Sequence, residues 1–184
     1  MMSNPYRVTS TRSIYSNSWI SVREDQVVKP DGSNGLFGIV EMKSGSTVLA
    51  LDAELNALLV REYKYAIDRT SLELVSGGID GAETPLDAAK RELLEETGAT
   101  SDFWTSLGKL DPFSSVINSP NYMFLARGVV FPKVHVARPD EPIQLFITPF
   151  STALQMVMDA EITHGASCVT ILKAAQILMR GKVA

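Results

Sequence analysis

The chain contains a single cysteine, Cys168, among its 184 residues. One cysteine cannot form an internal disulfide bond. Its surroundings, ASCVTILKAA, place no base at a recognisable distance, so the thiol lacks the partner that a nucleophile needs. We therefore interpret Cys168 as a small buried hydrophobe without a catalytic role.

Long apolar runs and runs of basic residues are also missing. No stretch approaches the ~20 apolar residues of a membrane span, and residues 1–19 lack the apolar segment of a secretory signal. The 17 basic residues are outnumbered by 21 acidic ones, which gives a net charge of −4 and disfavours a nucleic-acid surface. We expect a cytoplasmic protein that binds neither membranes nor nucleic acids.

The composition and length are those of a globular protein. Hydrophobic residues make up 45% of the chain and charged residues 21%, close to the average for soluble domains. A length of 184 residues suits one main domain with a small subdomain attached.

Strand patterns dominate residues 18–75, where apolar alternation is interrupted by turn signals such as PDGSNG at residues 30–35. Strands are expected again at residues 122–131 and 143–150, and helices at residues 151–160 and 166–180. Because strands flank one early helix and further helices follow, we predict a mixed α/β sandwich in which helices cover a sheet.

The early helix is predicted from Thr84 onward. Thr84 can cap its N-terminus, Pro85 is favoured at the first helical position, and Gly98 ends it. Ser151 and Ser167 are the N-cap candidates of the two later helices.

This early helix places three carboxylates on one face, because Glu92, Glu95 and Glu96 stand at i, i+3 and i+4. Such a face is either solvated or holds a strongly positive group. Carboxylates that bind hard divalent cations can neutralise a diphosphate and help to deprotonate a water molecule. Arg91 can pair with Glu95 at i+4, and a main-chain carbonyl from Ser76 or Gly77 can add a further oxygen ligand.

The longer segment GGIDGAETPLDAAKRELLEETGA, residues 77–99, resembles the Nudix box of the Nudix hydrolases. Gly77, Glu83, the Arg91-Glu92 pair, the Glu95-Glu96 pair and Gly98 fill its fixed positions. The resemblance implies a Nudix-type α/β/α sandwich that binds Mg²⁺, with Mn²⁺ possible.

The resemblance also implies roles for individual residues in the box. The metal ligands would be Ser76 and Gly77 through their carbonyls, with Glu92, Glu95 and Glu96; Arg91 joins the glutamates in the catalytic set. For Glu83 we favour a different role, as an acid of the first helical turn that complements the helix dipole.

The flanking segments SWISVREDQVVKPDG, LLVREYKYAIDRTSLELVSGGID and DEPIQLF resemble the ADP-ribose pyrophosphatase branch of the family. That resemblance implies an N-terminal β-subdomain, residues 1–43, for dimerisation and base stacking, and a hydrolase domain at residues 44–184. It assigns Trp19 and Phe37 to stacking on the base, with ordinary packing in the sheet as the simpler interpretation of both. Lys64 falls where that branch commonly has an arginine that meets phosphate or ribose. Arg61 and Arg69 are alternative basic contacts, with a surface position as the simpler interpretation of either, and the protein is expected to be a homodimer.

The segment DPFSSVINSPNYMFLA, residues 111–126, lacks the acid that many relatives carry before the corresponding strand. The resemblance therefore points to Glu141 as the catalytic base, with Asp140 as its neighbour and solvated loop acids as the simpler interpretation of both. For His164 we favour a structural role over proton transfer.

The sequence thus predicts a metal-dependent pyrophosphohydrolase of a nucleoside diphosphate sugar, with ADP-ribose as the first choice. UDP-glucose or GDP-mannose are alternative substrates. A catalytically silent binding module is the alternative of a different class.

Overall fold

The structure is a computed structural model that describes residues 3–131 and 143–180. The chain divides into two compact units. The first comprises Met1–Ser44 with Asp111–Pro120, and the second comprises Gly45–Leu110 with Asn121–Ala184. The sequence had assigned residues 111–120 to the hydrolase domain, whereas the structure groups this segment with the N-terminal unit.

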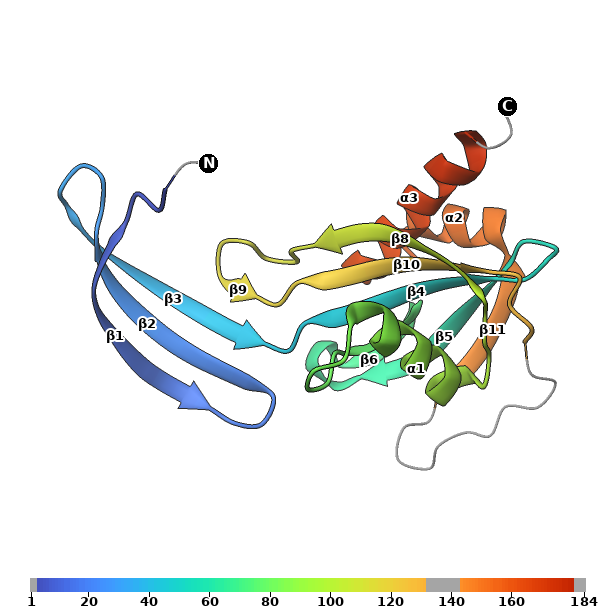
Figure 1. The fold of residues 1–184 in the computed structure, drawn as a ribbon, viewed down its shortest axis with the longest axis horizontal. Helices are drawn as coiled ribbons and strands as arrows, with labels where there is room; N and C mark the ends of the chain where they lie inside the picture. The colour runs from blue at the N-terminus through green and yellow to red at the C-terminus, as the bar shows by residue number, and fades with distance from the viewer. Residues whose placement is uncertain (1–2, 132–142, 181–184) are drawn as a thin grey trace. The chain divides into compact units, whose positions relative to one another are not determined.

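The first unit is a four-stranded sheet in the order β1-β2-β3-β9 (Figure 1). Its strands are β1 (Arg7–Ser16), β2 (Ile20–Val28), β3 (Asn34–Met42) and β9 (Ile117–Asn118). The three long strands pair antiparallel, and β9 adds to β3 in parallel. All ten residues of β1 are exposed, and among the described residues of this unit Asp25 and Val27 alone are buried. The unit therefore has almost no core of its own.

The second unit is built on a seven-stranded mixed sheet. The order β11-β5-β4-β10-β8 runs across it, with β6 paired to β5 and β7 paired to β4. The strands are β4 (Gly45–Leu51), β5 (Asn56–Lys64), β6 (Arg69–Glu73), β7 (Val75–Gly78), β8 (Phe103–Leu110), β10 (Asn121–Arg127) and β11 (Gln144–Pro149). A single turn of 3₁₀ helix, Tyr65–Ile67, connects β5 to β6. The central pair β4 and β10 is parallel.

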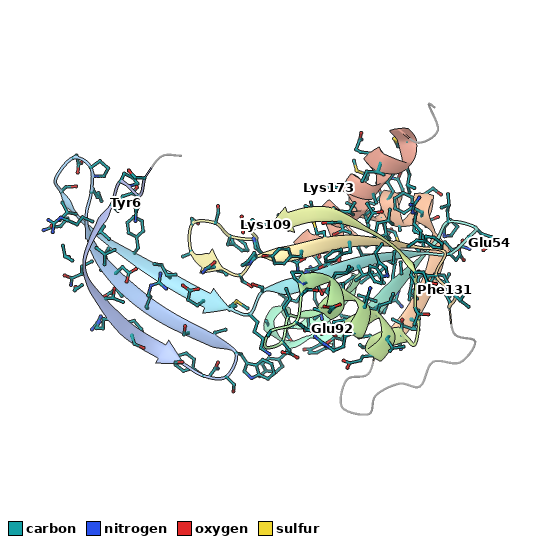
Figure 2. The ribbon with its side chains drawn as sticks, viewed as in Figure 1. Tyr6, Glu54, Glu92, Lys109, Phe131 and Lys173 are labelled. Carbon is teal, nitrogen blue, oxygen red and sulfur yellow. The ribbon has the colours of Figure 1, made fainter. Side chains whose placement is uncertain are left out.

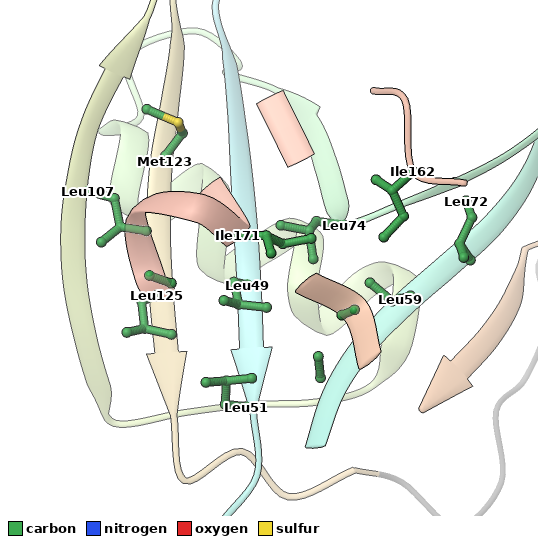
Figure 3. Close-up of a cluster of buried hydrophobic side chains, with 13 residues drawn as sticks. Leu49, Leu51, Leu59, Leu72, Leu74, Leu107, Met123, Leu125, Ile162 and Ile171 are labelled. Atoms are coloured by element: carbon green, nitrogen blue, oxygen red, sulfur yellow. The ribbon is translucent and has the colours of Figure 1, made fainter. Parts of the chain in front are cut away.

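Helices cover both faces of this sheet (Figure 1). They are α1 (Pro85–Thr97), α2 (Phe150–Met158) and α3 (Gly165–Arg180). Successive β4 side chains alternate between two cores: Leu49 and Leu51 join the cluster under α2 and α3 (Figure 3), while Val48 and Ala50 join the cluster under α1. The expected α/β/α sandwich is therefore confirmed.

The helix boundaries agree with the sequence at α1 and differ at the other two helices. Thr84 caps α1 by accepting a hydrogen bond from the Asp87 N–H at 3.2 Å, and Gly98 ends it with a left-handed φ of 71°. The N-cap predictions for Ser151 and Ser167 are wrong. Helix α2 follows β11 directly and has Pro149 as its N-cap without a side-chain bond, and α3 begins two residues before Ser167.

No helix in the described part of the chain is both long and apolar enough to cross a membrane.

Candidate active site

The three glutamates of the carboxylate face lie on α1, which packs against β7 and β4 in the second unit. Glu92, labelled in Figure 2, is more buried than Glu95: its side chain is 14% exposed, against 38% for Glu95. Glu96 is half-buried. The face is therefore partly withdrawn from water, which is not the situation of an ordinary solvated stripe.

Arg91 is the cation at the centre of this group. Its Nη1 lies 2.8 Å from Glu92 Oε1 and 3.3 Å from Glu95 Oε2, so the predicted i+4 pair is present. Its Nη2 donates to the Gly78 carbonyl at 2.8 Å. The hydrogen bonds to Glu83 and Glu92 raise the pKa of the guanidinium despite its burial. Arg91 therefore remains charged and balances part of the carboxylate face at every accessible pH.

Glu83 does not act as an acid of the first helical turn, because it precedes the N-cap Thr84. Its two carboxylate oxygens instead accept from Arg91 Nη2 at 2.8 Å and from Arg91 Nε at 3.2 Å. Glu83 Oε1 also accepts the Asp80 N–H at 2.6 Å. Glu83 thus ties the loop before α1 to Arg91 by a two-pronged ion pair, a geometry that fixes the direction of the guanidinium.

Gly77 on β7 makes room for the Glu92 carboxylate. A Cβ atom at residue 77 would lie within 2.5 Å of the Glu92 Cδ and of both carboxylate oxygens. Any side chain there would displace the carboxylate, so glycine is required by close approach rather than by an unusual φ. Burial beside this backbone raises the pKa of Glu92, and the hydrogen bond from Arg91 opposes the shift.

The donor set fits a hard divalent cation in its chemistry. Glu92, Glu95 and Glu96 offer carboxylate oxygens, and the Gly77 backbone is held against one of them. Across residues 3–131 and 143–180, however, no three acidic, histidine or cysteine side chains stand close enough together to hold an ion. Arg91 occupies the space between Glu92 and Glu95. A cation would therefore compete with the guanidinium for these two glutamates.

The Ser76 hydroxyl is already used within the sheet. It donates to the Leu74 carbonyl at 3.1 Å and lies 2.9 Å from Thr47 Oγ1 on the neighbouring strand β4. These bonds fix the start of β7, whose carbonyls were the predicted backbone ligands. The side chain of Ser76 serves the strand, and a ligand role would fall to its main chain.

Lys64, at the end of β5, is a predicted basic contact whose charge interacts with the carboxylate face of α1. Its ammonium donates to Glu62 and lies 3.8 Å from Glu73 Oε2. Burial lowers the pKa of Lys64, but the bond to Glu62 and the charges of Glu73 and Glu96 outweigh it and leave the pKa raised. The Glu96 contribution connects Lys64 to the carboxylate face of α1.

The other two predicted basic contacts have different surroundings. Arg61 stands an odd number of positions from Lys64, on the opposite face of β5, where its guanidinium lies 5.1 Å from the centre of the Phe146 ring. Arg69 pairs with Lys64 across β5 and β6 and donates to Thr163 Oγ1 at 2.9 Å. The structure thus groups Arg69 with Lys64 and separates Arg61 from it.

Trp19 and Phe37 both belong to the first unit. Trp19 lies in the turn between β1 and β2 and is 72% exposed. Phe37, on β3, is 37% exposed and contacts the Tyr6 ring edge-on with centroids 5.2 Å apart. Neither ring is used in a core, so both remain available for stacking.

The predicted base Glu141 and its neighbour Asp140 lie outside the described residues. Cys168 packs against the core under α2 and α3, as expected of a small hydrophobe, but it is only partly buried. Its thiol donates to the Ile162 carbonyl at 3.2 Å, and desolvation raises its pKa.

Glu73 and Ser167 are buried polar residues that the sequence did not indicate as members of the site. The signal for Glu73 was present in SLELV, where an acid interrupts an apolar strand. Burying a carboxylate is costly unless charged or hydrogen-bonding partners surround it. Ser167 gave no such signal, because a serine near a predicted helix start is usually an N-cap.

Comparison with known proteins places the chain in a family. Residues 43–161 match the NUDIX domain, and residues 6–40 match the nucleoside diphosphate sugar hydrolase N-terminal domain. The chain belongs to the NUDIX family and is a hydrolase, as the box predicted. Hydrolases of this family generally need divalent metal ions.

Two full-length relatives share the same description. An ADP-ribose pyrophosphatase of Mycobacterium tuberculosis is 27% identical over 94% of this chain and 84% of its own. An ADP-ribose pyrophosphatase of Bacillus subtilis is 26% identical over 93% of both chains. A solved structure described as an ADP compounds hydrolase superposes with a TM-score of 0.84 over 99% of this chain and 98% of its own at 18% identity, which establishes the shared fold.

Proposed function

We propose that this hydrolase cleaves the diphosphate of a nucleoside diphosphate sugar, with ADP-ribose as substrate and AMP and ribose 5-phosphate as products. The observation that carries the proposal is the partly buried carboxylate face of α1, with the Glu92 carboxylate packed against Gly77. The match of residues 6–40 to a nucleoside diphosphate sugar hydrolase N-terminal domain and the names of the relatives support the substrate class.

Glu92, Glu95 and Glu96, with the carbonyls of Ser76 and Gly77, are the proposed holders of Mg²⁺ or Mn²⁺. A bound divalent ion supplies charge neutralisation on the diphosphate and acidifies a water molecule. Arg91 and Glu83 keep the carboxylates in place through their ion pairs.

On the substrate side, Lys64 and Arg69 are proposed to contact the diphosphate or the ribose, because they stand side by side at the ends of β5 and β6. Arg61 lies on the other face of β5 and is therefore a weaker candidate for contact with the diphosphate or the ribose. Trp19 and Phe37 are proposed to stack on the base, and Glu141 to act as the general base.

A substrate panel tests the proposal directly. Purified protein with Mg²⁺ is incubated with ADP-ribose, UDP-glucose and GDP-mannose, and a phosphatase then releases phosphate from any monoester product. The highest kcat/KM is expected for ADP-ribose. A higher kcat/KM for UDP-glucose or GDP-mannose would change the assigned substrate and leave the type of reaction unchanged. Absence of turnover on all of them, with tight nucleotide-sugar binding, would favour the silent binding module.

We also propose that the protein is a homodimer that pairs through the first unit. The edge strand β1 is exposed along its whole length, and the unit buries only Asp25 and Val27 among its described residues. A long exposed edge with apolar side chains such as Ile14 invites pairing with a second copy. Ile14→Glu should therefore give monomers by light scattering, whereas Met158→Glu, at an exposed apolar site on α2, should leave the dimer intact.

A cytoplasmic location without membrane or nucleic-acid partners stays a prediction from composition.

A further inference from the structure

Glu73, His164 and Ser167 form a polar cluster that the proposed reaction does not use; Glu73 and Ser167 are buried, and the His164 side chain is 31% exposed. Glu73 ends β6, His164 immediately precedes α3, and Ser167 lies in the first turn of α3. The exposed fraction is 7% for Glu73 and 0% for Ser167. Buried polar groups of this kind are retained when each finds partners, and each of these does.

The contacts run in a chain from α3 to Lys64. Ser167 Oγ lies 2.9 Å from His164 Nδ1, and His164 Nδ1 lies 3.3 Å from Glu73 Oε2. The same Glu73 oxygen lies 3.8 Å from Lys64 Nζ. One carboxylate atom is thus shared between the imidazole and the ammonium.

The partners of Nδ1 constrain which ring nitrogen of His164 carries the proton. A carboxylate only accepts hydrogen bonds, so donation from His164 to Glu73 requires the proton on Nδ1, whereas the 2.9 Å contact with the Ser167 hydroxyl suits either tautomer. Burial lowers the pKa of His164, although the charge of Glu73 opposes this and that of Lys64 supports it. The neutral Nδ1–H form can donate to Glu73 and so hold the carboxylate that also faces Lys64.

Ser167 extends the cluster to the backbone of the active-site loop. Its Oγ accepts the Leu74 N–H at 2.9 Å, a contact between residues 93 positions apart. Leu74 lies between Glu73 and β7, the strand that carries Ser76 and Gly77. The start of α3 therefore holds both the side chain of Glu73 and the main chain that leads into β7.

We propose that Glu73 is the positioning residue that sets the location of the Lys64 ammonium for the diphosphate, and that His164 and Ser167 hold Glu73 in turn. An ammonium on a flexible stem has no preferred direction of its own. Glu62 and Glu73 supply that direction from two sides. Among the described residues the ammonium donates one hydrogen bond, to Glu62, which leaves donors for a phosphate oxygen.

The kinetic test rests on the proposed hydrolysis of ADP-ribose. Glu73→Gln keeps the shape and removes the charge; KM should rise about tenfold, the scale of one contact to a charged group, with kcat changed less than about threefold. Lys64→Met should raise KM similarly. Glu73→Gln added to Lys64→Met should then raise KM no further, because the group it positions is gone. Additive effects, or a loss confined to kcat and thermal stability, would reduce Glu73 to a structural residue.

Rescue at residue 164 separates hydrogen bonding from packing. His164→Asn retains an N–H donor near the position of Nδ1 and should keep KM within about threefold of wild type. His164→Leu removes the donor and should match Glu73→Gln. Equal kinetics for the two substitutions would contradict the proposal. Glu161→Gln, an exposed acid in the same loop, is the matched control and should have wild-type kinetics.

A spectroscopic test does not depend on turnover. The chain has 2 histidines, so ¹⁵N-histidine labelling gives two imidazoles, and the His164 signals are those lost in His164→Asn. The Nδ1–H tautomer is expected at pH 7.5, and Glu73→Gln should alter its shift. An Nε2–H tautomer would overturn the inference. If ADP-ribose is not hydrolysed, the proposed function fails while this measurement still decides whether the cluster is arranged as proposed.

Discussion

Replacing Gly77 by alanine tests whether the position of the Glu92 carboxylate governs activity. The new methyl carbon would lie within 2.5 Å of three Glu92 atoms, whereas ordinary contacts begin near 3.4 Å. The carboxylate must therefore move by about 1 Å or more, because the methyl is fixed to the β7 backbone and the glutamate side chain can rotate. The hydrogen bond of 2.8 Å from Arg91 to Glu92 would be lost in the same movement.

The expected effect separates activity from stability. A displacement of ~1 Å in a positioned catalytic group costs on the order of 10²-fold in rate, so kcat on ADP-ribose should fall by about that factor. The free energy of unfolding should change by less than ~1 kcal/mol, because the strain can be relieved by one side chain and Gly77 has no left-handed φ.

The assay is steady-state hydrolysis at saturating Mg²⁺ together with urea unfolding. Gly38→Ala is the matched control, since a Cβ at residue 38 meets nothing within 4 Å, and it should leave kcat and stability close to wild type. A wild-type kcat in Gly77→Ala would refute the reasoning. So would a loss of activity that merely follows loss of folded protein.

Three further predictions use the same protein. Hydrolysis should require millimolar Mg²⁺ or Mn²⁺ and stop in EDTA, because the donors are all oxygens; full turnover in the chelator would exclude the metal. Glu92→Gln and Glu96→Gln should each lower kcat by at least ~10²-fold, while Glu83→Gln, which weakens the pairing with Arg91 without touching the ion, should cost less; equal losses would contradict this ranking. Burial lowers the pKa of His164 below 6.5, so the unfolded state binds more protons in acid and stability falls as the pH drops below about 6.5. Urea unfolding at pH 7.5 and 5.5 should show a smaller fall for His164→Asn than for wild type.

Helix α1 could be predicted closely because its signals are local. Its cap, its first proline and its final glycine lie within the helix or next to it, and each acts through backbone geometry that depends little on the rest of the fold. The i, i+3, i+4 spacing of Glu92, Glu95 and Glu96 follows from the helix alone. The carboxylate face could therefore be predicted from the sequence without any tertiary structure.

Strands β1 and β8 were not predicted, and their position in the sheets explains why. Both are edge strands, with β1 exposed throughout and β8 largely exposed. An edge strand that buries little has no strict alternation of apolar and polar residues to detect. Their extended backbone is fixed by pairing with β2 and β10, which is information from outside the segment.

The contacts between different elements of the site could not be predicted from the sequence for a related reason. Gly77 and Glu92 belong to a strand and a helix that pack together, and Glu83 reaches Arg91 across eight positions that no helical repeat connects. The pairing of His164 with Glu73 joins segments that lie far apart in sequence. Periodicity reports which residues share a face of one element, but it does not report which two elements meet.

The ion pairs of Arg91 explain how three crowded carboxylates can be held together on one helix face. Glu92, Glu95 and Glu96 would repel one another if left together in a partly buried place. Arg91 neutralises part of this charge, and its ion pair with Glu83 holds the guanidinium in place. A divalent ion held by Glu92 and Glu95, as proposed, would compete only with the Nη1 contacts, because the bonds from Nη2 go to Gly78 and Glu83. Arg91 therefore stabilises the carboxylate face and would leave it accessible to such a cation.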